Sequence, residues 1–168
     1  MIVDNLSNSS ADVVDNIEKV SGIRPAFEKL DCLDFEGMDK LFTKYPGIKG
    51  IIHFAASKAV GESVQKPLLY YRNNLVSLIN LLELMPKHGV EGIIFSSSCT
   101  VYGQPDVLPV TEEAPIKKAE SPYGNTKQIN EEIIRDTVAS GSPINAIMLR
   151  YFCLLYTSPS PRDKRQSR

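Results

Sequence analysis

Apolar residues along the chain alternate between short continuous runs and longer stretches in which they recur every three or four positions. Short runs are typical of strands, whereas the wider spacing is typical of helices with one apolar face. The run at 50–56 predicts a strand buried on both faces. The predicted strands are 1–3, 50–56, 92–95 and 145–151, and the predicted helices are 11–20, 35–45, 68–88 and 123–138, the last with Ile129, Ile133 and Ile134 as its inner face.

Strands that alternate with helices pair in parallel, because each helix carries the chain back across the sheet. We therefore predict an α/β fold, in which a doubly wound parallel sheet carries helices on both faces. Such sheets bind ligands at the carboxyl ends of their strands. The proline-punctuated stretch at 104–122 predicts a long loop, and loops of this length are commonly functional.

The composition fits one globular domain. The chain has 168 residues, 42% of them hydrophobic, and its net charge of −1 excludes the broad basic field of a general nucleic-acid-binding protein. No apolar run reaches the length of a membrane span, and residues 1–10 show no secretory signal. We therefore expect a cytoplasmic protein that binds neither nucleic acid nor membrane. Cys32, Cys99 and Cys153 lie far apart, which favours neither a disulfide framework nor a metal site.

A tyrosine and a lysine lie four residues apart at the start of the last predicted helix. Residues at i and i+4 share a helix face, so Lys127 can place a positive charge near the Tyr123 phenol. Such a charge lowers the pKa of a phenol towards a value useful for proton transfer. An ordinary surface pair has the same spacing, so the pattern alone leaves both interpretations open.

Three serines, Ser96, Ser97 and Ser98, follow the strand predicted at 92–95. Hydroxyls at the carboxyl end of a strand face the ligand crevice, where one could hold a substrate oxygen against Tyr123. The alternative is a serine-rich turn without a function. The two histidines favour structural roles: His53 is expected to be a satisfied core residue within a strand, and His88 a surface residue that ends the long helix.

Together, the serines and the Tyr-x-x-x-Lys pattern resemble the Ser–Tyr–Lys constellation of the extended short-chain dehydrogenase/reductase superfamily. Within it, the sequence is similar to the nucleotide-sugar 4-epimerases that interconvert UDP-glucose and UDP-galactose. The similarity runs almost continuously from residue 2 to residue 152, through the segments 3–5, 52–56, 58–67, 70–74, 95–103, 121–127 and 149–152.

The resemblance implies a Rossmann-like fold and a tightly held NAD that is used catalytically rather than consumed. Tyr123, as phenolate, would remove the proton from the sugar C4 hydroxyl, and Ser98 would hydrogen-bond that oxygen. Lys127 would bind the nicotinamide ribose and keep the pKa of Tyr123 low. Lys58, Ser98 and Tyr123 would contact the UDP-sugar substrate, and the parent enzyme would be a homodimer.

The resemblance also implies a set of cofactor-binding residues. Asp4 resembles the acidic residue that accepts hydrogen bonds from the adenosine ribose. Structural interpretations stay open beside this one, since Phe54 and Ala55 could be plain core and Asp4 a turn residue. The implied set is Asp4, Asn5, Asn8, Asp31, Cys32, Phe54, Ala55, Ala56, Lys58, Asn74, Ser96, Tyr123, Lys127 and Tyr151.

The two ends of the sequence depart from the family pattern. The similarity begins at what resembles the second strand, so we expect the first βα unit, with its glycine-rich phosphate loop, to be missing. It stops at residue 152, before the C-terminal substrate domain of the family. We therefore expect 1–152 to be a partial NAD-binding domain that is inactive alone, and 153–168 to be a non-native or disordered tail.

Three other functions stay open. A nucleotide-sugar 4,6-dehydratase would place an Asp-Glu pair beside the catalytic hydroxyl, where this chain has Cys99 and Thr100, which favours simple epimerisation. A uronic-acid or pentose 4-epimerase fits the same residues, because segments outside this chain largely set the sugar specificity. A non-catalytic nucleotide-binding remnant is the third.

Overall fold

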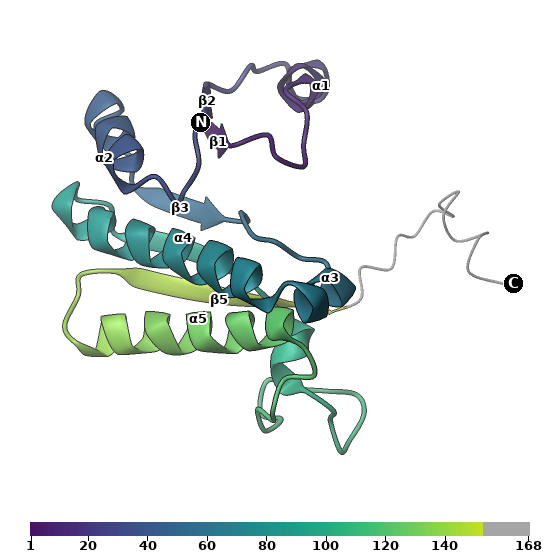
Figure 1. Ribbon diagram of the computed structural model, residues 1–168. Helices are drawn as coiled ribbons and strands as arrows, with labels where there is room; N and C mark the ends of the chain where they lie inside the picture. The colour runs from purple at the N-terminus through teal and green to yellow at the C-terminus, as the bar shows by residue number, and fades with distance from the viewer. Residues whose placement is uncertain (153–168) are drawn as a thin grey trace, which may run out of the picture.

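The computed structural model describes residues 1–152 as alternating strands and helices (Figure 1). The predicted tail at 153–168 lies outside the described residues. In chain order the elements are β1 (Ile2–Asp4), α1 (Asp12–Ser21), β2 (Phe27–Lys29), α2 (Phe35–Lys44), β3 (Gly50–His53), α3 (Val60–Gln65), α4 (Pro67–Lys87), β4 (Gly92–Ser98), the 3-10 helix η1 (Cys99–Tyr102), α5 (Pro122–Ala139) and β5 (Asn145–Tyr151). No helix within 1–152 has both the length and the apolar character that crossing a bilayer requires.

All strand pairs are parallel, as the alternation predicts, but the strands form two sheets rather than one. β1 pairs with β2, and β4 lies between β3 and β5. Because paired parallel strands run in one direction, the carboxyl ends of β3, β4 and β5 lie at a common edge. The register places Ser98, at the end of β4, opposite Tyr151, at the end of β5.

Helices α4 and α5 run side by side across one face of the three-stranded sheet (Figure 1). The inner residues Leu78 and Met85 of α4 are fully buried and belong to the same core as Phe95 of β4. Val3 at β1 and Leu30 just after β2 also pack against this core. Side-chain packing therefore joins the two sheets, which share no backbone ladder in the described part of the chain.

The other face of the three-stranded sheet is exposed in the described structure. Ile52, Ile94 and Ile147 are adjacent in the register and form a row across the sheet. Ile52 is 60% exposed and Ile147 is 58% exposed. The prediction that 50–56 is a strand buried on both faces is therefore wrong: β3 ends at His53, and only one of its faces meets helices.

Short elements and polar positions account for the other differences. β2 and α3 are too short for a periodic pattern and were not predicted. β4 continues through Ser98, so the serines extend the strand instead of forming a turn. On α5, Ile134 is buried as expected, but Lys127 and Glu131 share the buried face with it.

Candidate active site

The two strongest sequence signals meet at the carboxyl edge of the three-stranded sheet. Ser98 is the last residue of β4, and its side chain is almost completely buried. Across from it, α5 begins at Pro122, whose missing N–H is not needed at the first helical position. Ser121 caps this helix by accepting a hydrogen bond from the Gly124 N–H at 3.1 Å. The cap fixes where α5 starts and so places Tyr123 in its first turn, within hydrogen-bonding reach of Ser98.

Lys127 is buried one turn further along α5, and its exposed fraction is 4%. Its Nζ donates a hydrogen bond to the Ser96 carbonyl oxygen at 2.7 Å. The same nitrogen lies 4.8 Å from the centre of the Phe95 ring and 5.8 Å from the centre of the Tyr123 ring. Burial disfavours the charged ammonium and lowers the pKa of Lys127 to about 8.

Tyr123 is partly buried, and burial raises its pKa above the usual value. The nearby Ser98 hydroxyl opposes this shift in the pKa, and Cys99 adds to it electrostatically. The expectation that Lys127 keeps the pKa of Tyr123 low is therefore wrong for the described chain. The Lys127 amine bonds the Ser96 carbonyl oxygen, and burial of the phenol raises the pKa of Tyr123 more than the Ser98 hydroxyl lowers it.

His53 ends β3 and is buried beside these groups, with its ring stacked on Phe95 at 6.1 Å between centroids. Within residues 1–152, its Nε2 has no hydrogen-bond partner, so the expectation of a satisfied core histidine is wrong. Burial, reinforced by the charge of Lys127, lowers the pKa of His53 to about 4. His88, expected as a surface residue at the end of the long helix, is the C-cap of α4 and is partly buried, where it bonds Asp39 at 2.6 Å and stacks on Phe42.

The loop after β3 carries four of the predicted cofactor residues: Phe54, Ala55, Ala56 and Lys58. Phe54 is 63% exposed, which excludes the core interpretation for this ring. Asn74 of α4, predicted to bind the cofactor, uses its side-chain amide to bind the backbone of this loop. Its Oδ1 accepts from the Ser57 N–H at 2.8 Å and its Nδ2 donates to the Ser57 carbonyl oxygen at 2.9 Å. Lys58 is exposed on this loop.

A second group of predicted residues gathers at the carboxyl ends of β1 and β2. Asp4 accepts hydrogen bonds at Oδ1 from the Leu6 N–H at 2.6 Å and from the Ser9 hydroxyl at 2.8 Å, which hold the turn after β1. The Asn5 amide donates to Asp31 Oδ2 at 2.8 Å, which links the two strand ends. Burial raises the pKa of the neighbouring Cys32 to about 11, and Asp31 and Asp4 add to the shift, so this thiol stays protonated.

The structure therefore brings one part of the predicted site together and separates another. Ser96, Ser98, Tyr123 and Lys127 converge between β4 and α5, with Tyr151 opposite Ser98 on β5. The residues at the ends of β1 and β2 form a separate cluster, in which Asn8 is exposed.

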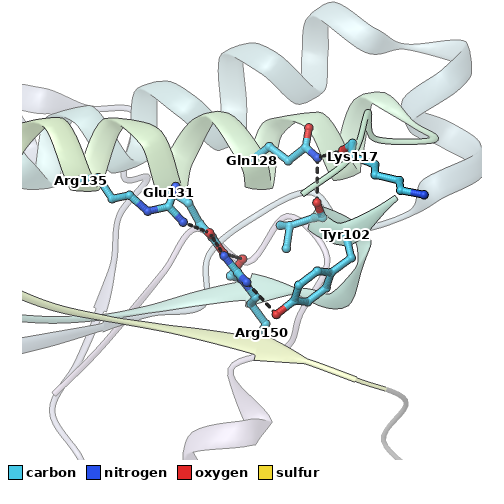
Figure 2. A network of polar contacts seen from close by, with 8 residues as sticks. Tyr102, Lys117, Gln128, Glu131, Arg135 and Arg150 are labelled. Atoms are coloured by element: carbon cyan, nitrogen blue, oxygen red, sulfur yellow. Dashed lines mark hydrogen bonds and ion pairs between the residues drawn. The ribbon is translucent and has the colours of Figure 1, made fainter. Parts of the chain in front are cut away.

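Sequence analysis missed a buried polar network beside the converging residues (Figure 2). Glu131, 1% exposed, accepts hydrogen bonds from the Ser97 hydroxyl at 2.6 Å and from the guanidinium of Arg150 at 2.6 and 2.9 Å. Arg150 also donates to the Tyr102 hydroxyl at 2.7 Å. The i+4 spacing of Glu131 from Lys127 was the available signal, but only the fold shows that Arg150 faces it.

Gln128 anchors the long loop to the same helix (Figure 2). Its Nε2 donates to the carbonyl oxygen of Val101, in η1, at 2.8 Å, and to that of Lys117, in the loop. The backbone at Gly103 passes close to the backbone at Lys118, near the other end of the loop. Only glycine fits here easily, because its φ is +60° and a Cβ would lie 2.6 Å from the Lys118 carbonyl oxygen. The loop is therefore tied down at the end that borders Tyr123.

A parallel α/β sheet with a Ser–Tyr–Lys group at its carboxyl edge defines the dehydrogenase/reductase class of nucleotide-cofactor proteins. Residues 1–166 match the NAD dependent epimerase/dehydratase family, and the chain belongs to this family.

The relatives within the family are consistent with one another. The chain is 45% identical over 160 residues to UDP-glucose 4-epimerase of Dictyostelium discoideum, covering 95% of this chain and 46% of that protein. It is 44% identical over 162 residues to UDP-glucose 4-epimerase of Bacillus subtilis, covering 96% of this chain and 47% of that protein. The crystal structure of UDP-glucose 4-epimerase from Bifidobacterium longum, in complex with NAD+ and UDP, matches with a TM-score of 0.86 at 45% identity. That match covers 89% of this chain and 44% of the other. The chain thus spans about half the length of the curated relatives it matches.

Proposed function

We propose that this chain carries the proton-transfer residues of a UDP-glucose 4-epimerase, which interconverts UDP-glucose and UDP-galactose with bound NAD. The observation that carries the proposal is the convergence of Tyr123, Lys127 and Ser98, in which Lys127 is fixed to the Ser96 carbonyl oxygen. The relatives named above, each a UDP-glucose 4-epimerase, support the choice of reaction.

Each of the three side chains has a distinct role in this proposal. The Tyr123 phenolate takes the proton from the sugar C4 hydroxyl, and the Ser98 hydroxyl holds the same oxygen. Lys127 supplies a positive charge 5.8 Å from the centre of the Tyr123 ring and still has two N–H donors to offer beside the one that Ser96 accepts. When bound, NAD supplies the hydride acceptor and donor. Because burial raises the pKa of Tyr123, turnover should increase with pH from neutral to alkaline values.

The described residues fit NAD at both clusters. The two hydrogen bonds that Asp4 accepts within residues 1–152 both fall on Oδ1, which leaves Oδ2 for a ribose hydroxyl. The ring of Phe54, just after β3, is exposed, and the buried Nε2 of His53, at the end of β3, has no hydrogen-bond partner within residues 1–152. The charge of Lys127 acts on His53. We propose the fourteen cofactor-binding residues named from the sequence as the binding set, with Asn74 acting through Ser57.

A hybrid protein tests this function directly. Residues 1–152 would replace the matching segment of the Bifidobacterium longum enzyme. Turnover of UDP-galactose would be measured first, and turnover of UDP-N-acetylgalactosamine in a separate assay. We expect turnover, and we expect Tyr123→Phe to remove it while the hybrid still binds NAD. Tyr71→Phe is the matched control, because Tyr71 bonds Asn125 at 2.7 Å and has no place in the proton transfer. Turnover that survives Tyr123→Phe would refute the assigned base.

We also propose that the whole protein is a cytoplasmic homodimer, as the family resemblance implies. Leu68, Val76 and Ile79 on α4 are exposed, which supports a contact through this helix. Light scattering on the hybrid tests it: the dimer is expected, and Val76→Glu should shift the mass to that of a monomer.

A further inference from the structure

Three residues at four-residue intervals line one face of α5. Tyr123, Lys127 and Glu131 are each one helical turn apart, so their side chains point in nearly the same direction. The first two carry the proposed chemistry. Glu131 is 1% exposed and is buried next to them without a role in the proton transfer.

The three serines that end β4 each lie against one residue of this row. The Ser96 carbonyl oxygen accepts from Lys127 Nζ at 2.7 Å, and the Ser97 hydroxyl donates to Glu131 Oε1 at 2.6 Å. Ser98 follows directly and carries the hydroxyl assigned to the substrate oxygen. Ser97 therefore sits between the two residues whose positions matter for the chemistry, and its own side chain bonds α5 rather than the site.

Glu131 is itself held rigidly. Arg150 of β5 donates to both of its carboxylate oxygens, and Arg135 adds a contact of 2.6 Å from the outer side of the helix (Figure 2). Burial alone would raise the pKa of Glu131, but the hydrogen bonds from Arg150 and Ser97 more than offset it, and the pKa lies below the usual value. The carboxylate is therefore ionised, and ionised acceptors make the shorter and stronger hydrogen bonds.

We propose that Glu131 and Ser97 form a positioning pair, which locks the end of β4 to α5 and so keeps Ser96 and Ser98 in place against Lys127 and Tyr123. This inference rests on the proposed function. The pair touches neither substrate nor cofactor and acts through its neighbours. A displacement of about 1 Å in such a site can cost roughly a hundredfold in rate, so the pair controls kcat more than substrate binding.

The test compares Ser97→Ala with two controls in the hybrid protein. Ser77→Ala removes a hydroxyl of equal size from an equally buried position on α4, where its Oγ makes only a 3.5 Å contact. Arg135→Ala removes the outer contact to the same carboxylate. We expect Ser97→Ala to lower kcat about tenfold to a hundredfold, with KM within about twofold. Both controls should stay within about twofold in kcat, and all variants are normalised to folded protein by thermal melting.

The outcomes separate this inference from the proposed function. An inactive parent hybrid would refute the function. An active parent in which Ser97→Ala behaves like Ser77→Ala, or raises KM at unchanged kcat, would refute the positioning pair and leave the function standing.

A second measurement does not depend on turnover. In the 168-residue chain grown with lysine labelled with 13C at Cε, the signal absent from Lys127→Arg identifies Lys127. It should titrate near pH 8 in the parent and in Ser77→Ala, as burial dictates. In Ser97→Ala it should titrate at least one pH unit higher, because a loosened β4 lets the amine reach water. An unchanged titration in Ser97→Ala would contradict the proposal.

Discussion

The side-chain amide of Asn74 holds both backbone polar groups of Ser57, accepting from its N–H at 2.8 Å and donating to its carbonyl oxygen at 2.9 Å. The same Nδ2 donates to Thr126 Oγ1 on α5 at 3.1 Å. One buried side chain of α4 therefore fixes the loop after β3 and ties it to the helix that carries Tyr123. A residue that resembles a cofactor ligand in sequence is, in the structure, the support of the loop after β3.

Replacing this amide should destabilise the fold. Asn74→Ala leaves the Ser57 backbone groups and Thr126 without their partner, and buried polar groups left unsatisfied cost about 1–3 kcal/mol. We expect the free energy of unfolding, measured by urea titration of the 168-residue chain, to fall by about 2 kcal/mol. Asn73→Ala is the control: it removes partly buried bonds to Ser57 Oγ at 3.0 Å and to Asn74 Oδ1 at 3.2 Å, but leaves the Ser57 backbone paired with Asn74, so it should cost clearly less. Equal losses would contradict the role given to Asn74.

His53 should make the protein sensitive to acid. Its folded-state pKa of about 4 lies below the usual 6.5, so the unfolded chain binds the proton more readily between these values. The stability that the neutral ring contributes is complete above about pH 6.5 and is lost as the pH falls through 4, by about 1.4 kcal/mol per pH unit. Urea titrations at pH 7, 6 and 5 measure this slope.

The variant that isolates this effect is His53→Gln, which cannot be protonated. Its pH dependence should be flatter than that of the parent over the same range. His88→Gln is the matched control, since His88 directly follows α4 and pairs with Asp39 instead of lying beside Lys127. If both variants keep the slope of the parent, the acid sensitivity comes from other groups.

Lys127 should have the opposite effect at alkaline pH. Its folded-state pKa of about 8 lies below the usual 10.5, so burying the ammonium costs stability at neutral pH, and the cost is relieved as the pH rises from 8 to 10.5. Lys127→Met should therefore gain stability relative to the parent at pH 7 and lose most of that gain at pH 10. The full pKa difference corresponds to about 3 kcal/mol. A gain that does not depend on pH would mean that Lys127 titrates in the folded protein as it does in the unfolded chain.

Gly103 offers a test of the loop beside the site. An alanine there must adopt φ +60° and would also place its Cβ 2.6 Å from the Lys118 carbonyl oxygen. Gly141→Ala has the positive φ, +90°, but meets nothing within 4 Å, so it separates backbone strain from collision. We expect Gly141→Ala to cost about 1 kcal/mol and Gly103→Ala to cost more, in urea titrations. A smaller loss for Gly103→Ala would show that the loop moves away freely.

The sequence predicted those parts of the fold in which one segment carries its own pattern. Apolar spacing placed the helix at 68–88, and the structure has it at Pro67–Lys87. β2 has only three residues, too few to show a hydrophobic period, so the sequence did not predict it. Ile52 lies in an apolar run and was therefore expected to be buried. It is exposed, because nothing in the described chain covers that face of the three-stranded sheet.

The candidate site divides in the same way. Tyr123 and Lys127 are predictable because a helix brings i and i+4 together. The burial of Glu131 is not, since its partner Arg150 lies nineteen residues further on and reaches it only through the pairing of β5 with β4. The raised pKa of Tyr123 also depends on tertiary burial, which spacing alone does not reveal.

The register of the three-stranded sheet has a consequence for the speed of folding. Gly50 pairs with Gly92, and Gly92 pairs with Asn145, so each ladder closes a loop of some forty to fifty residues. Helices such as α4 need only neighbouring residues and can form within microseconds. The strands must wait for long-range encounters, and proteins rich in such contacts fold in milliseconds to seconds. Assembly of β3, β4 and β5, rather than helix formation, is thus the slow step that creates the edge where Ser98 meets Tyr123.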